Sequence, residues 1–492
     1  MQRQILLNQE ISVDVPGHLG VFGSNSLWLW LDRGALRIGT ILAGLVLVRY
    51  LGPSNYGIYA TAIATGAIAN IVTDLGLTRY GARTAAAWPQ EIPRILAGSL
   101  LITAIFFVLE VIAFCVSLAL GQTYAAALTA GLILTNFEGT SSLCAALLTG
   151  ALRSRAILPA SILSVCGTIA ITLLAVWQHF SVLTLLSAMA FKSIIILGVR
   201  LLPMREWWPA SRLFRFDEVV ATVHRAWPYF SYALAEIAYS QMPVLCLSLV
   251  ADRVQVGLFA AAIIIANIFP QWLFAASDAL LPIITKFYES GESSRTSIMM
   301  QRVTDLFVMI TVPIAIALST LAPVICSLMG QQFTSSAPIL RIAAFNCILT
   351  AIGTLLGSVY LTAANRIRER RNVFGAGVLA TVVLILVLGR IYGGAGAAVA
   401  VLAGNLVIDA AYVFLSRDAG LDIAIRPILS ACLIGGAAVL VELTARQFMQ
   451  NSILLTAIAL LTYAAGIILI SRHTLGAAWG TFLECIHQRS EA

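Results

Sequence analysis

The stretch LVRYLGPSNYGIYATAIA, residues 47–64, contains two apolar runs with a short turn between them. The first run ends at Arg49 and Tyr50, residue types that anchor helices at a membrane–water interface. Glycine followed by proline is typical of a tight turn, and Gly57 allows two helices to approach closely. We therefore interpret this stretch as the hairpin between two membrane-spanning helices.

The rest of the chain has the same apolar character. Of its 492 residues, 60% are hydrophobic and 11% are charged, and the mean hydropathy is +0.92. Soluble domains carry about 25% charged residues, so a compact soluble enzyme of this composition would have too little polar surface to face water. The composition therefore predicts a polytopic membrane protein.

Apolar runs of about twenty residues recur along the whole chain, and each can cross roughly 30 Å of hydrocarbon as a helix. We expect an all-α fold with about 14 transmembrane helices, whose ends are accurate to a few residues. The predicted ranges are 25–49, 55–78, 95–119, 123–149, 157–177, 182–202, 227–250, 255–285, 303–328, 337–362, 373–390, 394–416, 427–446 and 452–471.

The charges in the predicted loops support this order of spans. If the N-terminus is cytoplasmic, most arginines and lysines fall in cytoplasmic loops, as the positive-inside rule requires. The outside turns hold only Arg49, Arg253, Arg390 and Arg446. Both termini are therefore predicted to be cytoplasmic. The net charge of +7 is spread over short loops, which argues against binding to nucleic acid.

The turn at residues 47–64 has a counterpart about two hundred residues later, in VADRVQVGLFAAAII, residues 250–264. Gly57-Ile58-Tyr59-Ala60 aligns with Gly257-Leu258-Phe259-Ala260, and each copy follows an outside arginine at the first hairpin of six predicted spans. Spans one to six and seven to twelve are therefore predicted to be two parallel halves.

This repeat divides the chain into six predicted parts. They are a cytoplasmic N-terminal segment (1–24), an N-lobe of six spans (25–202), a cytoplasmic amphipathic linker (203–226), a C-lobe of six spans (227–416), two further spans (427–471) and a cytoplasmic tail (472–492).

The sequence contains none of the motifs that metal, cofactor or catalytic chemistry requires. The eight cysteines stand singly, without a CxxC pair or a Cys/His ligand set. The five histidines are scattered, and no DxD motif or phosphate-binding P-loop is present. We therefore expect no metal, no cofactor and no enzymatic activity.

Four stretches together resemble the polysaccharide transporter family, the Wzx-like oligosaccharide-lipid flippases of the MOP superfamily. They are RYLGPSNYGIYATAIATGAIANIVTDLGLTRYGAR, VGLFAAAIIIANIFPQWLFAASDALLPIITKF, LAPVICSLMGQQFTSSAPILRIAAF and IYGGAGAAVAVLAGNLV. Each is weak alone, but they occur in the family's order and spacing, and the resemblance covers about residues 26–471.

The resemblance implies a MATE-like, V-shaped arrangement of two six-helix lobes, with two additional C-terminal helices. It implies an oligosaccharide linked to undecaprenyl diphosphate as the substrate. This lipid would be moved by alternating access to the outer leaflet of a bacterial inner membrane, for O-antigen, capsule or exopolysaccharide synthesis. The implied partners are the lipid bilayer, a polysaccharide polymerase and a chain-length regulator.

The chain departs from the family in its seventh span. Many members carry a basic residue and an aspartate there, whereas this chain has the uncharged residues Ser240-Gln241-Met242-Pro243. An ion-coupling role is therefore not transferred to this position.

Other functions compete with a flippase. A MATE-like antiporter of drugs or small molecules belongs to the same superfamily, but such transporters usually have twelve spans, so the two extra helices favour the flippase. A membrane polysaccharide polymerase or ligase needs a polar loop or domain for its chemistry, whereas the predicted outside loops are short. A structural partner in a glycan assembly complex stays open.

Cations within the spans are candidates for binding the diphosphate, because a charge at the bilayer centre costs about 2.5–3.5 kcal/mol and needs a cavity or a partner. The candidates are Arg33, Arg37, Lys192 and Arg341. Arg33 and Arg37 share one face of the first span and can make forked hydrogen bonds, although Asp32 and a glutamate could simply neutralise them. Arg341 lies near the outside end of its span, where snorkelling competes with a binding role.

Acidic residues within the spans are candidates for ion coupling. They are Glu236, Asp278, Glu138, Glu110 and Asp409. Buried carboxyl groups can carry protons or cations. They can equally be static partners of the buried cations, and the sequence leaves both interpretations open.

Overall fold

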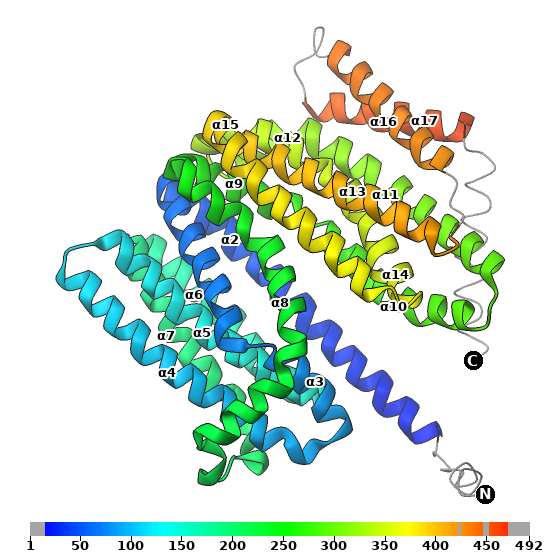
Figure 1. Ribbon diagram of the computed structural model, residues 1–492. Coiled ribbons are helices and arrows are strands. Elements are labelled where there is room, and N and C mark those ends of the chain that lie inside the picture. Colours follow the sequence, from blue (N-terminus) through cyan, green and yellow to red (C-terminus); the bar gives the residue numbers. More distant parts are fainter. Residues whose placement is uncertain (1–14, 422–424, 446–451, 471–492) are drawn as a thin grey trace, which may run out of the picture. The chain divides into compact units, whose positions relative to one another are not determined.

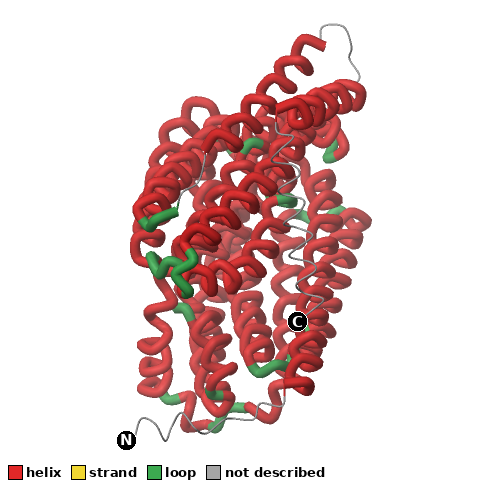
Figure 2. Tube along the Cα trace, turned by 90° about the vertical axis from the view of Figure 1, so that its right-hand side faces the viewer, coloured by secondary structure: helices red, strands yellow, loops and turns green. Residues whose placement is uncertain are grey.

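The computed structural model describes residues 15–421, 425–445 and 452–470, and within these ranges every regular element is a helix (Figures 1 and 2). The longer helices are α2 (Val15–Asp74), α3 (Leu77–Ala87), α4 (Ile92–Ala119), α5 (Thr123–Gly150), α6 (Leu158–Gln178), α7 (Val182–Leu201), α8 (Phe216–Val250), α9 (Arg253–Ala266), α10 (Pro270–Glu289), α11 (Ser293–Leu328), α12 (Ala337–Ala344), α13 (Asn346–Gly353), α15 (Ile367–Asp418), α16 (Ile425–Ala445) and α17 (Ser452–Ile470). The short ones are η1 (Pro89–Glu91), η2 (Ser154–Ala156), η3 (Leu202–Trp207), η4 (Ser211–Phe214), η5 (Gln331–Ser336), η6 (Thr354–Tyr360) and α14 (Leu361–Ala363).

The helices have the length and composition of membrane spans. In the described part of the chain, 8 helical segments are long and apolar enough to cross a membrane, and three shorter apolar helices accompany them. The predicted all-α polytopic membrane protein is thereby confirmed. The number of 14 spans stays a prediction, because two of the long helices each contain two predicted spans.

Both of these long helices break at a glycine. α2 breaks at Gly52 (φ 69°, ψ 171°), between the first and second predicted spans. α15 breaks at Gly393 (φ 58°, ψ −137°), between the eleventh and twelfth. Glycine adopts positive φ without the steric penalty that other residues pay. The two glycines therefore mark two of the predicted hairpins.

Contacts within the chain define two compact units. Unit 1 contains residues Met1–Leu47 and Gly66–Ala233, and unit 2 contains residues Val48–Thr65 and Leu234–Ala492. In unit 1, α5 is the central helix, because it packs against α3, α4 and α7. Its side chains Leu143, Leu147 and Leu148 are buried in that core.

In unit 2, α11 packs against α12, α13, α16 and α17. Val312 and Ile316 from α11 form one buried apolar cluster with Ala438 from α16 and with Ala459 and Tyr463 from α17. The last two described helices are thus attached to unit 2 by a continuous apolar core.

The exposed surface of α4 is apolar along one side. Ile105, Leu109, Ile112 and Val116 follow each other at intervals of three or four residues, and all are exposed. Such a stripe is unfavourable in water when it is continuous, but it suits contact with lipid chains. This side of α4 is therefore the face expected to meet the bilayer.

Two predicted spans are interrupted in the structure. The span expected over 255–285 is divided into α9 and α10, and Pro270 begins the second helix. The span expected over 337–362 is divided into α12, α13, the π-helix η6 and α14. Proline favours the first turn of a helix because it lacks the N–H that the first turn leaves unpaired anyway, and π-helical turns occur frequently at functional sites.

Candidate functional site

The charged residues predicted to be functional stand on eight different helices. Unit 1 contains Arg33 and Arg37 on α2, Glu110 on α4, Glu138 on α5 and Lys192 on α7, whereas unit 2 contains Glu236 on α8, Asp278 on α10, Arg341 on α12 and Asp409 on α15. The side chains of Arg33, Arg37 and Asp278 lie outside the part of the chain that the structure describes.

Lys192 and Glu138 form an ion pair between α7 and α5. The distance from Lys192 Nζ to Glu138 Oε1 is 3.8 Å, and Nζ also donates a hydrogen bond of 2.9 Å to Thr168 Oγ1 on α6. The Lys192 side chain is 11% exposed, whereas the Glu138 side chain is 53% exposed. A methyl group on Gly167 would lie 3.3 Å from the Lys192 stem. The lysine is thus packed against small and polar residues, whereas its acidic partner is more than half exposed.

Glu110 and Asn136 form a second polar pair, which is buried between α4 and α5. Asn136 Nδ2 donates to Glu110 Oε2 at 3.1 Å and to the Thr103 carbonyl oxygen at 3.3 Å. Thr103 and Thr140 continue this polar contact between the same two helices. These hydrogen bonds support the interpretation of Glu110 as a static partner in the core of unit 1.

Asp409 is the most isolated acidic side chain among the candidates that the structure describes. It is 7% exposed, and its Oδ2 has no hydrogen-bond partner among the described residues. Its Oδ1 lies against Gly353, where a methyl group would be only 2.4 Å away. Gly353 ends α13, and the π-helix η6 begins at the next residue. The carboxyl group therefore packs against an irregular point of the backbone.

A cluster of neutral polar side chains lies one helical turn before Asp409 on α15, around Asn405. Asn405 Nδ2 donates to the Tyr239 hydroxyl at 2.8 Å and to Asn346 Oδ1 at 2.5 Å. Tyr239 comes from α8, Asn346 from α13, and both Asn405 and Asp409 from α15. Three helices of unit 2 thus contribute to a neutral polar cluster one helical turn from Asp409. Of these residues, only the charged Asp409 could be predicted, because buried neutral polar residues have no distinctive sequence signal.

Two further candidates belong to unit 2. Glu236 on α8 is exposed, and Arg341 on α12 is partly buried in the last turn of that helix. Their proposed roles stay predictions.

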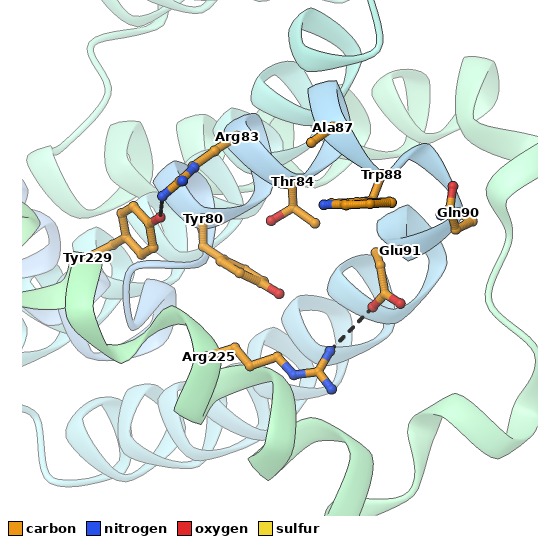
Figure 3. Close-up of a pocket in the computed structure, with 9 residues that line it drawn as sticks. All are labelled: Tyr80, Arg83, Thr84, Ala87, Trp88, Gln90, Glu91, Arg225 and Tyr229. Carbon is orange, nitrogen blue, oxygen red and sulfur yellow. Dashed lines mark hydrogen bonds and ion pairs between the residues drawn. The ribbon is translucent and has the colours of Figure 1, made fainter. Parts of the chain in front are cut away.

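A pocket in unit 1 was not predicted from the sequence. It has a volume of about 480 Å³ and is formed by α3, η1 and the first part of α8 (Figure 3). Tyr80 and Trp88 contribute aromatic faces, while Arg83, Arg225 and Glu91 contribute charges. In the sequence these arginines served only as indicators of membrane topology, so their convergence with the aromatic residues was missed.

The chain matches one protein family by sequence. A family model described as "Polysaccharide biosynthesis protein" matches residues 22–288. No curated protein matches the chain at the level of sequence.

Two solved structures share the fold. The lipid II flippase MurJ in an inward closed conformation aligns with a TM-score of 0.69 at 14% identity, over 92% of this chain and 99% of that chain. An inward-facing multidrug resistance MATE family transporter of the MOP superfamily aligns with a TM-score of 0.61 at 16% identity, over 77% of this chain and 94% of that chain. At these identities the likeness shows the fold alone, and it supports the predicted all-helical fold.

Proposed function

We propose a function from one premise: the chain belongs to the polysaccharide biosynthesis protein family, whose model matches residues 22–288. The proposed function is a flippase that moves an undecaprenyl-diphosphate-linked oligosaccharide across the cytoplasmic membrane by alternating access. Its product would supply the synthesis of a surface polysaccharide, such as O-antigen, capsule or exopolysaccharide. The family match carries this proposal, and the fold shared with a lipid II flippase supports it.

Lys192 is proposed to bind the diphosphate of this substrate, together with Arg33 and Arg37 of α2. The geometry of Lys192 supports this role, because its ammonium group is only weakly paired with Glu138 at 3.8 Å. An ammonium group is a compact point charge on a flexible stem, so it can exchange a carboxylate for a phosphate with a small movement. Glu138 would then release the lysine when substrate enters and recover it when substrate leaves.

Asp409 is proposed to couple transport to an ion gradient. A carboxylate without a partner is costly to bury, so we expect a proton or a sodium ion at this group during part of the transport cycle. The nearby Tyr239 and Asn405 offer oxygen atoms of the kind that a hard cation prefers. Measuring whether a pH gradient or a Na⁺ gradient drives transport distinguishes H⁺ coupling from Na⁺ coupling.

A second candidate function is the antiport of a small molecule. One observation favours it, namely the TM-score of 0.61 with a multidrug resistance MATE family transporter. The family match favours the flippase over this alternative, because the matching family is described by polysaccharide biosynthesis.

The experiment that tests the proposed function uses a strain from which the gene is deleted. Undecaprenyl-diphosphate-linked sugars are extracted, and their membrane face is determined before extraction with a probe that does not cross the membrane. We expect complete oligosaccharide units to accumulate on the cytoplasmic face while surface polymer is lost. Normal outward display of these units, or altered drug sensitivity as the sole effect, would contradict the proposal.

A further inference from the structure

We propose that the pocket between α3, η1 and α8 in unit 1 binds a saccharide that carries an anionic group, either a phosphate or a carboxylate. This site is separate from Lys192 and Asp409, which were proposed above to act during transport. The binding proposal stands on the pocket itself, whereas the identity of the ligand as the glycan end of the transported lipid rests on the proposed function. The predicted topology places the loop between α3 and α4 in the cytoplasm, where such a substrate would first meet the protein.

Trp88 provides a stacking surface at a fixed position. Its backbone N–H donates to the Thr84 carbonyl oxygen at 2.6 Å, which ends α3, and Pro89 begins η1 directly afterwards. The side chain is nevertheless 60% exposed. A rigid backbone with an open indole face favours stacking, because the negative face of the ring attracts the partly positive C–H groups of a sugar ring.

Tyr80 and Tyr229 form the opposite aromatic wall. Their ring centroids are 6.1 Å apart, and Arg83 donates a 2.7 Å hydrogen bond to the Tyr229 hydroxyl (Figure 3). The helices that carry these rings touch at Gly76, where a methyl group would lie 2.8 Å from the carbonyl oxygen of Ala226. Because backbone meets backbone there, α3 and α8 hold the aromatic wall at a constant separation.

The pocket has more positive than negative charge, because two arginines and one glutamate line it. Glu91 accepts hydrogen bonds of 2.8 and 3.2 Å from Arg94, which is outside the pocket, whereas Arg225 approaches the same carboxylate only to 3.6 Å. Arg83 makes its hydrogen bond to a neutral hydroxyl and has no ion pair in the described part of the chain. Arg225 thus shares Glu91 with Arg94, which also pairs with Glu218, and Arg83 has no acidic partner there, so an anionic group can join the two pocket arginines with charge-assisted hydrogen bonds.

The neutral groups of the pocket favour an anionic sugar over inorganic phosphate or a phospholipid headgroup. Thr84 and Gln90 also line it and offer a hydroxyl and an amide, which can hydrogen-bond to sugar hydroxyl groups. Inorganic phosphate would use the arginines alone, and a phosphatidylglycerol headgroup has no ring to stack on the aromatic faces. The volume of about 480 Å³ falls in the range of roughly 300–1,000 Å³ that small-molecule sites occupy. Aromatic faces, neutral hydrogen-bonding groups and arginines together fit an anionic saccharide best.

A direct binding experiment tests this assignment. The full-length protein is placed in phosphatidylcholine nanodiscs, and saturation-transfer NMR and calorimetry follow the binding of N-acetylglucosamine 1-phosphate. N-acetylglucosamine and inorganic phosphate are the comparison probes, and we expect each to bind at least about tenfold more weakly than the sugar phosphate, which corresponds to about 1.4 kcal/mol. Equal binding of inorganic phosphate, or no binding of the sugar phosphate, would overturn the proposal.

Variants locate the binding. Trp88→Ala and Arg225→Gln are each expected to weaken binding of the sugar phosphate by about tenfold, whereas Trp88→Phe retains an aromatic face and most of the affinity. Trp177→Ala is the matched control, because Trp177 on α6 is 73% exposed and outside the pocket. If Trp88→Ala and Arg225→Gln both bind like wild type, the pocket is not the site. Phosphatidylglycerol nanodiscs form the lipid arm of the test, and loss of sugar phosphate binding there would assign the pocket to a lipid headgroup instead.

The source of the saccharide is tested separately from its binding. If the ligand is the transported lipid, Trp88→Ala lowers the initial flipping rate in proteoliposomes at low substrate concentration. An unchanged rate in this variant would overturn that identification and leave a soluble sugar phosphate as the ligand. Binding that persists in a protein without flipping activity would refute the proposed function while the pocket proposal stands, so the two failures are distinguishable.

Discussion

Gly57 of α2 and Gly257 of α9 pack against each other's helix through the backbone. A methyl group on Gly57 would lie 2.0 Å from the carbonyl oxygen of Arg253, and one on Gly257 would lie 1.9 Å from that of Pro53. The contacts are reciprocal, because each carbonyl belongs to the residue four positions before the opposite glycine. Such pairing of equivalent residues is what a local two-fold relation produces. The two copies of the sequence repeat therefore meet at this point within unit 2.

Gly57→Ala is expected to destabilise the protein. The added methyl group has no room beside a backbone carbonyl, and overpacking of this kind typically costs about 1–3 kcal/mol. Thermal unfolding in detergent measures the effect as a lower midpoint. Gly44→Ala on the same helix is the control, since nothing lies within 4 Å of its added carbon. Equal midpoints for both variants would show that the contact at Gly57 is not tight.

Lys192→Gln is expected to lower the flipping rate by about tenfold or more. The substitution removes the cation proposed to bind the diphosphate and keeps a side chain that can still hydrogen-bond to Thr168. Arg390→Gln is the matched control, because Arg390 is an exposed cation on α15 outside both polar clusters. The initial rate in proteoliposomes is measured for each variant at equal protein content. A wild-type rate in Lys192→Gln would show that Lys192 does not bind the diphosphate.

Asp409→Asn is expected to uncouple transport from its driving ion. The amide has nearly the same shape as the carboxyl group but can neither carry the proton nor neutralise a cation. Imposed pH and Na⁺ gradients should therefore accelerate flipping by the wild type and leave this variant unaffected. Glu110→Gln is the comparison, because the Asn136 hydrogen bond makes Glu110 a structural group. Retained coupling in Asp409→Asn together with lost coupling in Glu110→Gln would reverse the assignment.

Gly353→Ala tests the same site without changing the carboxyl group. Its methyl group would lie 2.4 Å from Asp409 Oδ1, so the aspartate must move away from the end of α13. We expect a changed dependence of flipping on the ion gradient, with the protein still folded. Gly375→Ala on α15 is the control, because its added carbon has nothing within 4 Å. An unaltered gradient response in Gly353→Ala would mean that the position of Asp409 is not critical.

Most helix boundaries followed from the sequence because hydropathy determines them directly. The predicted span 123–149 corresponds to α5 (Thr123–Gly150), and 182–202 corresponds to α7 (Val182–Leu201). The π-helix Thr354–Tyr360 was missed, since a change of hydrogen-bond register leaves the hydropathy unchanged. Side-chain partners were missed for a related reason. Lys192 and Glu138 are far apart in the sequence, and only the packing of α7 against α5 brings them together.

The pocket at Trp88 shows another limit of the sequence. Arg83 and Arg225 belong to the arginines that the positive-inside rule places in cytoplasmic loops, and that rule says nothing about their neighbours in space. Their meeting depends on the close packing of α8 on Gly76, which has positive φ of 83°. A single glycine among many carries no signal of that contact. The chemistry of the pocket therefore became visible only in three dimensions.

The measurement that tests the central claim most directly uses the purified protein in proteoliposomes. A lipid-linked oligosaccharide with an undecaprenyl diphosphate anchor is placed in the membrane, and a glycan-modifying enzyme outside the vesicles reports how much of it reaches the outer leaflet. If the protein is a flippase, wild-type vesicles expose the inner pool much faster than protein-free vesicles and vesicles with Lys192→Gln. Exposure no faster than in protein-free vesicles, combined with transport of a small cationic dye, would contradict the account and identify the protein as a small-molecule antiporter.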